Sequence, residues 1–282
     1  MRRERPIGLS RFSFSAFQKT SNFQDSDQLG IGIRINAIPW YIIYRMLKHF
    51  KAFLQLGLFH PGLLILAWRV KRQKKTYLTY GKLYNLASSF KNLKKRSPGP
   101  LEVSEFGVGR GGSAMLLAWL IGHYGGQLTL FDVFGRIPAP TEKDGQSAID
   151  RYQVILDHEQ ENYYGNIPDL IDLIKTEIST VCDLNQVSFI QGKYEVTLPF
   201  IISNKAYDLV HIDCDWYESS KAVFDYLKNH LHPGAILQVD DYSNWQGSHM
   251  AVDEAEWLKP SNFRLVDGAL VVELGLLPDL GT

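Results

Sequence analysis

From Leu101 onward, short apolar runs alternate with longer segments in which apolar residues recur every three or four positions. This alternation predicts strands and helices in turn, as in an α/β fold with a mostly parallel sheet and helices on both faces. The expected strands are 101–106, 127–132, 187–191, 207–213, 235–240 and 263–274. The expected helices are 113–123, one within 147–164, 167–181, 219–231 and 251–258.

A different pattern fills residues 38–72, where apolar and basic residues share a helical repeat that His60-Pro61-Gly62 interrupts. The apolar stretch from Phe53 to Trp68 is 16 residues long and broken, whereas a membrane-spanning helix needs about 20. The basic flanks and tryptophans would suit a helix pair lying in a membrane interface. A hairpin packed on the main domain or on a second subunit is the alternative.

Charge divides the chain into an N-terminal basic part and a C-terminal acidic part. Residues 1–100 hold 19 Lys and Arg against 3 Asp and Glu, and residues 101–282 hold 11 against 27. We therefore expect a flexible basic tail (1–37), a helical extension (38–75) and a main domain (76–282). The tail lacks the apolar core of a secretory signal, which leaves an organellar transit peptide or an unstructured tail.

Two cysteines among 282 residues provide neither a disulfide framework nor zinc-ligand spacing. This composition favours a reducing compartment, and we expect a cytoplasmic protein with peripheral membrane contact through 38–72. The basic run Arg69–Lys75 has no aromatic platform beside it, which argues against nucleic-acid binding.

A glycine-rich loop, Glu105-Phe-Gly-Val-Gly-Arg-Gly-Gly-Ser113, lies between the first expected strand and helix. Such a loop allows backbone N–H groups and a helix N-terminus to approach a ligand closely. Asp132 ends the next strand about 20 residues later, where a carboxylate can accept the hydroxyls of an adenosine ribose. Glycine loops of this kind also bind other nucleotides or form tight turns.

Two pairs of carboxylates follow later strands: Asp213 with Asp215, and Asp240 with Asp241. Crowded carboxylates repel one another unless a cation neutralises them. The oxygen-only ligand set favours Mg²⁺ or Mn²⁺ over Zn²⁺. Solvated loop acids are the alternative.

Three further residues near these acids invite a chemical role. His211 lies within an apolar strand and is expected to be a packed core histidine. His249 follows the second acidic pair closely enough to reach the site, so it is a catalytic candidate. Cys214 stands between two carboxylates, which should raise its pKa and make it a poor nucleophile.

Several stretches in this order resemble the macrocin and mycinamicin O-methyltransferase family, to which the novobiocin O-methyltransferase is also similar. They are Tyr77-Leu-Thr-Tyr-Gly-Lys-Leu-Tyr-Asn-Leu86, Glu105-x-Gly-Val-x-Arg-Gly-Gly112, Gly192 through Thr197-Leu-Pro199, Asp213-x-Asp-x-Tyr-Glu-Ser219 and Asp240-Asp-Tyr242. The resemblance covers residues 76–258 and implies a Rossmann-like class I methyltransferase fold. It also implies S-adenosylmethionine, a divalent cation, a sugar hydroxyl as acceptor and a homo-oligomer.

By this resemblance, Asp215, Asp240 and Asp241 are expected to bind the metal, with Asp215 also the candidate general base. The residues expected to bind the cofactor are Glu105, Gly107, Gly109, Arg110, Gly111, Ser113, Asp132, Gly192 and Asp213. The chain departs from the family at Asp132-Val-Phe-Gly-Arg-Ile-Pro138, which lacks a hydroxyl beside the aspartate, and at Gly109, where an aromatic residue is usual. Residues 1–75 match nothing in the family.

The expected function is Mg²⁺-dependent O-methylation of a sugar or glycosylated metabolite with S-adenosylmethionine as methyl donor. A nicotinamide-dependent oxidoreductase would explain the glycine loop and Asp132 but would leave the four later acids without a purpose. A membrane-associated binding protein on a degenerate methyltransferase fold would explain the basic, apolar extension.

Overall fold

The fold is built on a seven-stranded sheet with strand order β3-β2-β1-β4-β5-β7-β6, within the residues that the computed structural model describes: 40–157, 167–201, 204–258 and 261–275. Strands β1 to β5 are parallel, whereas β7 pairs antiparallel with both β5 and β6. The strands are β1 (Leu101–Phe106), β2 (Gly126–Asp132), β3 (Val187–Gln191), β4 (Tyr207–Ile212), β5 (Leu231–Val239), β6 (Asn262–Val266) and β7 (Ala269–Glu273).

The sequence prediction of one strand at 263–274 is wrong, because this segment is a hairpin of β6 and β7. Asp267 and Gly268 form its turn with φ angles of 51° and 89°. Two residues with positive φ match the twist of the flanking strands, and Asp-Gly is typical of such turns. The other predicted strands are present, although β5 begins at Leu231, four residues before the predicted start at 235.

The predicted helices of the main domain are present with shifted ends. They are α4 (Gly112–Tyr124), α5 (Gln146–Asp157), α6 (Leu170–Ile178), α8 (Tyr217–Leu227) and α9 (Gln246–Glu254), and a further helix, α3 (Tyr80–Arg96), precedes β1. Short helices not predicted from the sequence are η3 (Glu142–Asp144), η6 (Leu184–Gln186), α7 (Tyr194–Thr197) and η7 (Leu198–Phe200), whereas η8 (Glu256–Leu258) is the end of the predicted helix 251–258. Residues 158–166, into which the helix prediction within 147–164 extended, lie outside the described residues.

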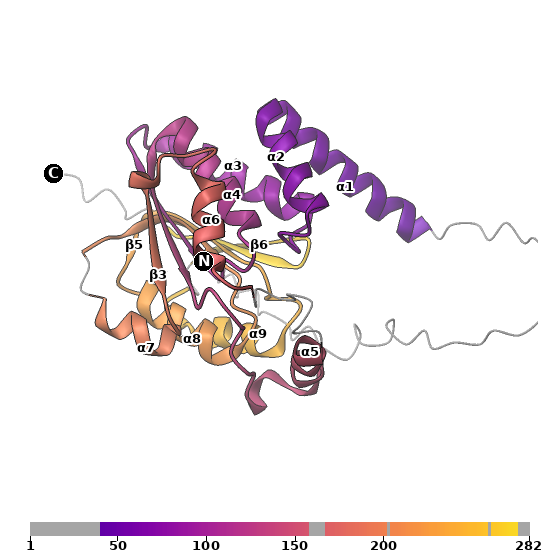
Figure 1. The fold of residues 1–282 in the computed structure, drawn as a ribbon, viewed down its shortest axis with the longest axis vertical. Helices are drawn as coiled ribbons and strands as arrows, with labels where there is room; N and C mark the ends of the chain where they lie inside the picture. The colour runs from indigo at the N-terminus through magenta and orange to yellow at the C-terminus, as the bar shows by residue number, and fades with distance from the viewer. Residues whose placement is uncertain (1–39, 158–166, 202–203, 259–260, 276–282) are drawn as a thin grey trace, which may run out of the picture. The chain divides into compact units, whose positions relative to one another are not determined.

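The sheet separates two hydrophobic cores, and adjacent residues on one strand belong to opposite cores. Leu209 and Ile236 pack with α3, α4 and α6, whereas their neighbours Val210 and Leu237 pack with α7, α8 and α9. Figure 1 shows these two helix layers on either side of the sheet. Side chains that alternate between faces, each buried under helices, explain why the strands read as continuous apolar runs. The predicted α/β architecture is confirmed.

The N-terminal extension forms two helices, α1 (Trp40–Phe59) and α2 (Pro61–Arg72). Pro61 occupies the first position of α2, where a missing N–H costs nothing, and the His60 side chain accepts a hydrogen bond from the Gly62 N–H. Leu56 and Leu63 belong to the same core as α3 and α4, so the inner side of the hairpin packs on the main domain. No helix among the described residues is long and apolar enough to cross a membrane. The predicted tail, 1–37, lies outside these residues.

Candidate functional site

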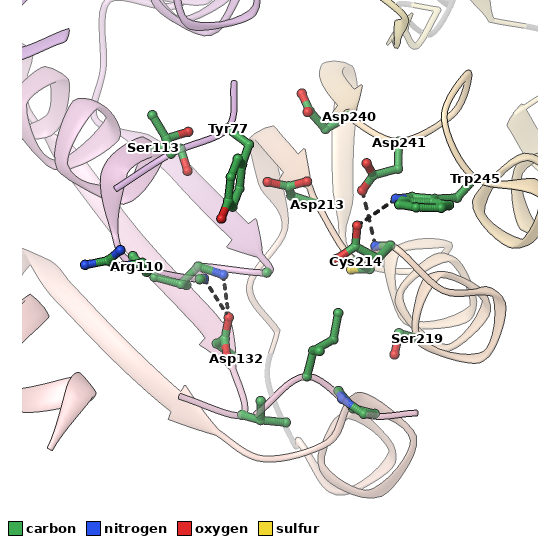
Figure 2. A pocket seen from close by; sticks show the side chains of 18 of the residues that line it. Tyr77, Arg110, Ser113, Asp132, Asp213, Cys214, Ser219, Asp240, Asp241 and Trp245 are labelled. Atoms are coloured by element: carbon green, nitrogen blue, oxygen red, sulfur yellow. Dashed lines mark hydrogen bonds between the residues drawn. The ribbon is translucent and has the colours of Figure 1, made fainter. Parts of the chain in front are cut away.

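The carboxyl ends of β1, β2, β4 and β5 border one cavity of about 480 Å³, a size typical of small-molecule sites. Most of the predicted site residues line it: Gly107, Gly109, Arg110, Ser113, Asp132, Asp213, Asp215, Asp240 and Asp241. Figure 2 shows Arg110 and Asp132 on one side, Asp241 and Trp245 on the other, and Asp213 between them. The glycine loop and the paired acids therefore serve a single site.

The glycine loop passes very close to the end of β4. A Cβ on Gly107 would lie 1.9 Å from the Asp213 carbonyl oxygen, and the φ of Gly107 is 92°. A side chain at this position would therefore meet backbone, and only glycine fits. Gly109, where the family usually has an aromatic residue, borders the cavity, and a Cβ there would meet nothing within 4 Å.

Asp132 holds the glycine loop in place. Its Oδ2 accepts hydrogen bonds from the N–H groups of Val108 (2.6 Å) and Gly109 (2.9 Å), and its Oδ1 accepts one from Phe134 (2.7 Å). Burial raises the pKa of Asp132, and these backbone hydrogen bonds oppose the rise. A carboxylate has about four acceptor positions, so one is left for a ligand hydroxyl. Asp132 thus has a structural role that the sequence did not reveal.

Three carboxylates converge at the other side of the cavity. One oxygen from each of Asp213, Asp240 and Asp241 lies within 4.8 Å of the other two. Asp215, expected from the sequence as a metal ligand, is outside this set of three but lines the same cavity. Asp213, expected to bind the cofactor, lines the cavity and is also a member of this set of three.

Asp240 is held between two buried cationic side chains. Lys82 of α3 donates to its Oδ2 at 2.7 Å, and His211 Nε2 lies 3.7 Å from its Oδ1. Burial would lower the pKa of His211, but Asp240 and Glu105 outweigh it and raise that pKa to about 9. Burial would raise the pKa of Asp240, but His211 and Lys82 lower it. Asp240 is therefore held in its ionised form.

Glu105, His211 and Gln238 form a polar row across β1, β4 and β5, under α3. They are in register on neighbouring strands, and Glu105 Oε1 lies 2.8 Å from His211 Nδ1. Asn85 of α3 donates to Gln238 at 2.7 Å. The buried histidine expected from the sequence is thus also part of an ionic network. Glu105 is fully buried and is not among the residues lining the cavity.

The remaining carboxylates carry negative charge that the protein compensates only in part. Burial and the charges of Asp241, Asp240 and Asp215 raise the pKa of Asp213 well above its usual range. Burial and Asp240 raise the pKa of Asp241 to about 6. Such shifts arise where like charges share a desolvated site. As predicted, burial and the neighbouring acids also raise the pKa of the Cys214 thiol well above normal.

Asp215 adopts a left-handed backbone conformation with a φ of 57°. Its N–H donates to Asp241 Oδ2 at 3.2 Å, and Trp245 Nε1 donates to its Oδ1 at 2.8 Å. Left-handed conformations are costly for a residue other than glycine and concentrate at functional sites. The hydrogen bond from Trp245 orients the Asp215 carboxylate, and the one to Asp241 holds its backbone.

Besides Glu105, three more predicted site residues do not line the cavity, namely Gly111, Gly192 and His249. Gly111 is the N-cap residue of α4, and Gly192 donates its N–H to the Asp132 carbonyl at 2.9 Å. Both therefore stabilise the backbone next to residues that line the cavity. His249 stacks on Tyr242 with ring centroids 4.3 Å apart, and its Nε2 lies 3.4 Å from Asp253. These contacts give His249 a packing role.

Among the residues that line the cavity and had no role in the sequence analysis, Lys82 and Trp245 contact the acids. Lys82 belongs to the stretch that resembles the family, yet its distance from Asp240 along the chain hid the ion pair. Trp245 follows the Asp240–Asp241 pair closely in the sequence, and this proximity could have indicated that it lies at the site.

Comparison with known proteins places these features in context. The model of the macrocin O-methyltransferase family (TylF) matches residues 74–260. None of the curated proteins compared with this chain matches its sequence. The O-methyltransferase NovP has a similar structure, with a TM-score of 0.59 and 22% identity over 71% of this chain and 82% of NovP. The calicheamicin methyltransferase CalS11 superposes with a TM-score of 0.58 and 17% identity over 90% of this chain and 100% of its own.

Proposed function

The chain belongs to the macrocin O-methyltransferase family and is an S-adenosylmethionine-dependent O-methyltransferase; from this premise we propose that it methylates a sugar hydroxyl with the help of a divalent cation. The observation that carries the proposal is the convergence of Asp213, Asp240 and Asp241 beside the glycine loop, in one cavity. The glycine loop and the acid group can therefore bring a donor and an acceptor together in one cavity.

The charges of the site fit a divalent cation. Asp213, Asp215, Asp240 and Asp241 provide four carboxylates, whereas the buried cations beside them are Lys82 and His211. The raised pKa values of Asp213 and Asp241 indicate that some negative charge lacks a partner. Carboxylate oxygens are the ligands that Mg²⁺ and Mn²⁺ prefer. We therefore assign Asp213, Asp240 and Asp241 as the metal ligands, with Asp215 adjoining them.

Asp215 is the proposed general base. It lines the cavity, and Trp245 and Asp241 hold it in a strained conformation. A carboxylate within hydrogen-bond reach of an acceptor hydroxyl can take its proton as the new bond forms. Because the direction of Asp215 is fixed before substrate arrives, little reorganisation is needed at the moment of transfer.

Methyl transfer from the sulfonium of S-adenosylmethionine is an in-line displacement, in which the acceptor oxygen forms a bond to the methyl carbon as the carbon–sulfur bond breaks. A divalent cation supplies polarisation of the acceptor hydroxyl, which is too weakly acidic to ionise at neutral pH. Gly107, Gly109 and Asp132 would hold the donor on one side of the cavity. Asp213 and Asp241 would fix the acceptor on the other, so that the two reacting atoms are aligned.

A sugar acceptor follows from the family assignment and from the carboxylates around the cation. A vicinal diol can bind a hard cation through two oxygens, which is the geometry that sugars offer. The direct test is methyl transfer from labelled S-adenosylmethionine to a panel of glycosylated metabolites and glycolipids, with Mg²⁺ or with EDTA. Mg²⁺-dependent labelling of a sugar hydroxyl supports the proposal. Labelling that persists in EDTA and in both Asp215→Asn and Asp240→Asn contradicts the metal and base assignments.

A further inference from the structure

Helix α1 has a second apolar face that the fold does not bury. Its inner side is buried at Ala52 and Leu56. The opposite side exposes large apolar side chains at Tyr44, Met46, Leu47, Phe50, Leu54 and Leu58, which we call the outer face of α1. Leu58 is 87% exposed and Tyr44 66%. Helix α2 adds exposed Ile65 and Trp68. Contiguous apolar surface of this kind marks an interaction site.

The charge around the outer face indicates what binds it. The sequence contains no Asp or Glu between Asp27 and Glu102. Lys51 is exposed on α1, and Arg69, Arg72 and Lys74 are exposed at the end of α2. Arg72 lies 5.1 Å above the Trp68 ring. Apart from Asp267, which forms an ion pair with Lys48, no acid pairs with the basic residues of α1 and α2 among the described residues. Apolar side chains set among basic residues are the combination that binds anionic lipid.

We propose that the outer face of α1 binds an anionic membrane surface. The apolar side chains insert among the acyl chains near the headgroups, and the lysines and arginines contact the lipid phosphates. A second copy of the chain docked through the same face would bring two strongly basic segments together, which like-charge repulsion opposes. The charge of the segment therefore favours lipid over self-association.

The hairpin leads directly into the active-site cavity. Lys75, Thr76 and Tyr77 follow α2 and line that cavity, and Tyr77 is exposed. Figure 1 shows α1 on the outer side of α3, away from the sheet. Lipid binding through the hairpin would thus hold the cavity close to a surface, where a membrane-bound acceptor could reach it. The face belongs to a region outside the matched family segment, 74–260.

Flotation of the full-length protein with vesicles tests the proposal. The protein should float with phosphatidylcholine vesicles that contain phosphatidylglycerol, and should float less with phosphatidylcholine alone or at high salt. Leu54→Ser should weaken binding about tenfold, because one leucine no longer leaves water. Lys51→Glu should weaken binding to the anionic vesicles roughly tenfold and should leave binding to pure phosphatidylcholine vesicles unchanged. Leu54 is 47% exposed and Lys51 is also exposed, so both variants should fold normally.

Two matched variants provide the controls. Leu173→Ser removes a leucine of similar exposure, 51%, from α6, and Lys228→Glu reverses an exposed charge after α8. Neither should change flotation. The proposal is overturned if the wild type does not bind anionic vesicles, or if the control variants lose binding equally. It is also overturned if the lipid-free protein is a dimer that Leu54→Ser converts to a monomer, because the face would then be a subunit contact.

Discussion

Lys82 of α3 and Asp240 at the end of β5 form a buried ion pair with an Nζ–Oδ2 distance of 2.7 Å, although 158 residues separate them in the sequence. Lys82 also donates to the Asp240 carbonyl oxygen at 3.1 Å. Burial would lower the pKa of Lys82, but Asp240 outweighs burial and raises it, so the lysine stays charged. Helix α3 is therefore part of the active site, and its lysine stabilises the acid group.

Replacing Lys82 should cost far more stability than replacing a surface lysine. Lys82→Met leaves a buried Asp240 carboxylate without its main partner, and we expect a loss of about 3 kcal/mol in the free energy of unfolding. Lys221→Met removes the exposed pair with Asp225, which should cost at most about 1 kcal/mol. Urea denaturation of both variants measures the difference. Equal losses would show that the buried pair adds nothing.

The close approach of the glycine loop to β4 makes Gly107 irreplaceable. Gly107→Ala places a methyl group 1.9 Å from a backbone oxygen at a φ of 92°, so the loop must move and several kcal/mol of stability should be lost. A Cβ at Gly99 meets nothing within 4 Å, and Gly99→Ala should be nearly neutral. Thermal unfolding, with and without S-adenosylhomocysteine, compares them. A Gly107→Ala protein with unchanged melting and binding would contradict the loop geometry.

The stability of the metal-free protein should fall as pH rises from about 4 to about 9, first through Asp241 and then through His211. The pKa of Asp241 is raised to about 6, so the folded state holds this proton more tightly than the unfolded state, and deprotonation destabilises the fold. The pKa of His211 is raised to about 9, so its stabilising charge is present at low pH and lost as pH passes that value. Both signs agree.

Mg²⁺ should oppose the first of these losses, because a cation stabilises the ionised form of Asp241. Unfolding free energies measured across this range, with EDTA or with Mg²⁺, provide the check. Asp241→Asn should remove the part of the decline between about pH 4 and about pH 6. Stability in EDTA that rises with pH over the same window would show that these carboxylates are not protonated in the folded protein.

Trp245 should affect the reaction rate by orienting the carboxylate of Asp215. Trp245→Phe removes the indole N–H that donates to Asp215 Oδ1, and kcat should fall roughly tenfold with little change in the KM for S-adenosylmethionine. The matched variant is Trp216→Phe, which removes an indole hydrogen bond of 2.9 Å to the Pro138 carbonyl and should preserve kcat. Steady-state kinetics with the acceptor identified by labelling measures both. Equal kcat values for the two variants would show that Trp245 does not position Asp215 for catalysis.

The sequence revealed the fold and the site to different extents. The strands were predictable because Leu209, Val210 and their counterparts are apolar on both faces of a covered sheet. The β6–β7 hairpin was missed because its turn residues, Asp267 and Gly268, stand within a longer apolar run. The cavity was predictable because acids follow parallel strands that end at one edge. Polar pairs such as Lys82–Asp240 and Asn85–Gln238 depend on how α3 crosses the sheet, which no local pattern specifies.

The role of Asp132 illustrates the same limit. The sequence correctly placed Asp132 at the end of β2. Its role in binding the ribose of the cofactor stays a prediction. What the sequence did not show is that the Val108, Gly109 and Phe134 N–H groups already occupy most of its carboxylate. Likewise, the acids were found as two pairs, but only the three-dimensional arrangement groups Asp213 with Asp240 and Asp241.

Titration of the purified protein with Mn²⁺, followed by electron paramagnetic resonance of the free ion, tests the proposed metal centre most directly. The account predicts one tightly bound Mn²⁺ per chain, displaced by excess Mg²⁺. Binding should be lost in Asp241→Asn and kept in Asp253→Asn, which changes an exposed acid of α9. Absence of bound Mn²⁺ in the wild type, or equal binding in the two variants, would contradict a metal held by Asp213, Asp240 and Asp241.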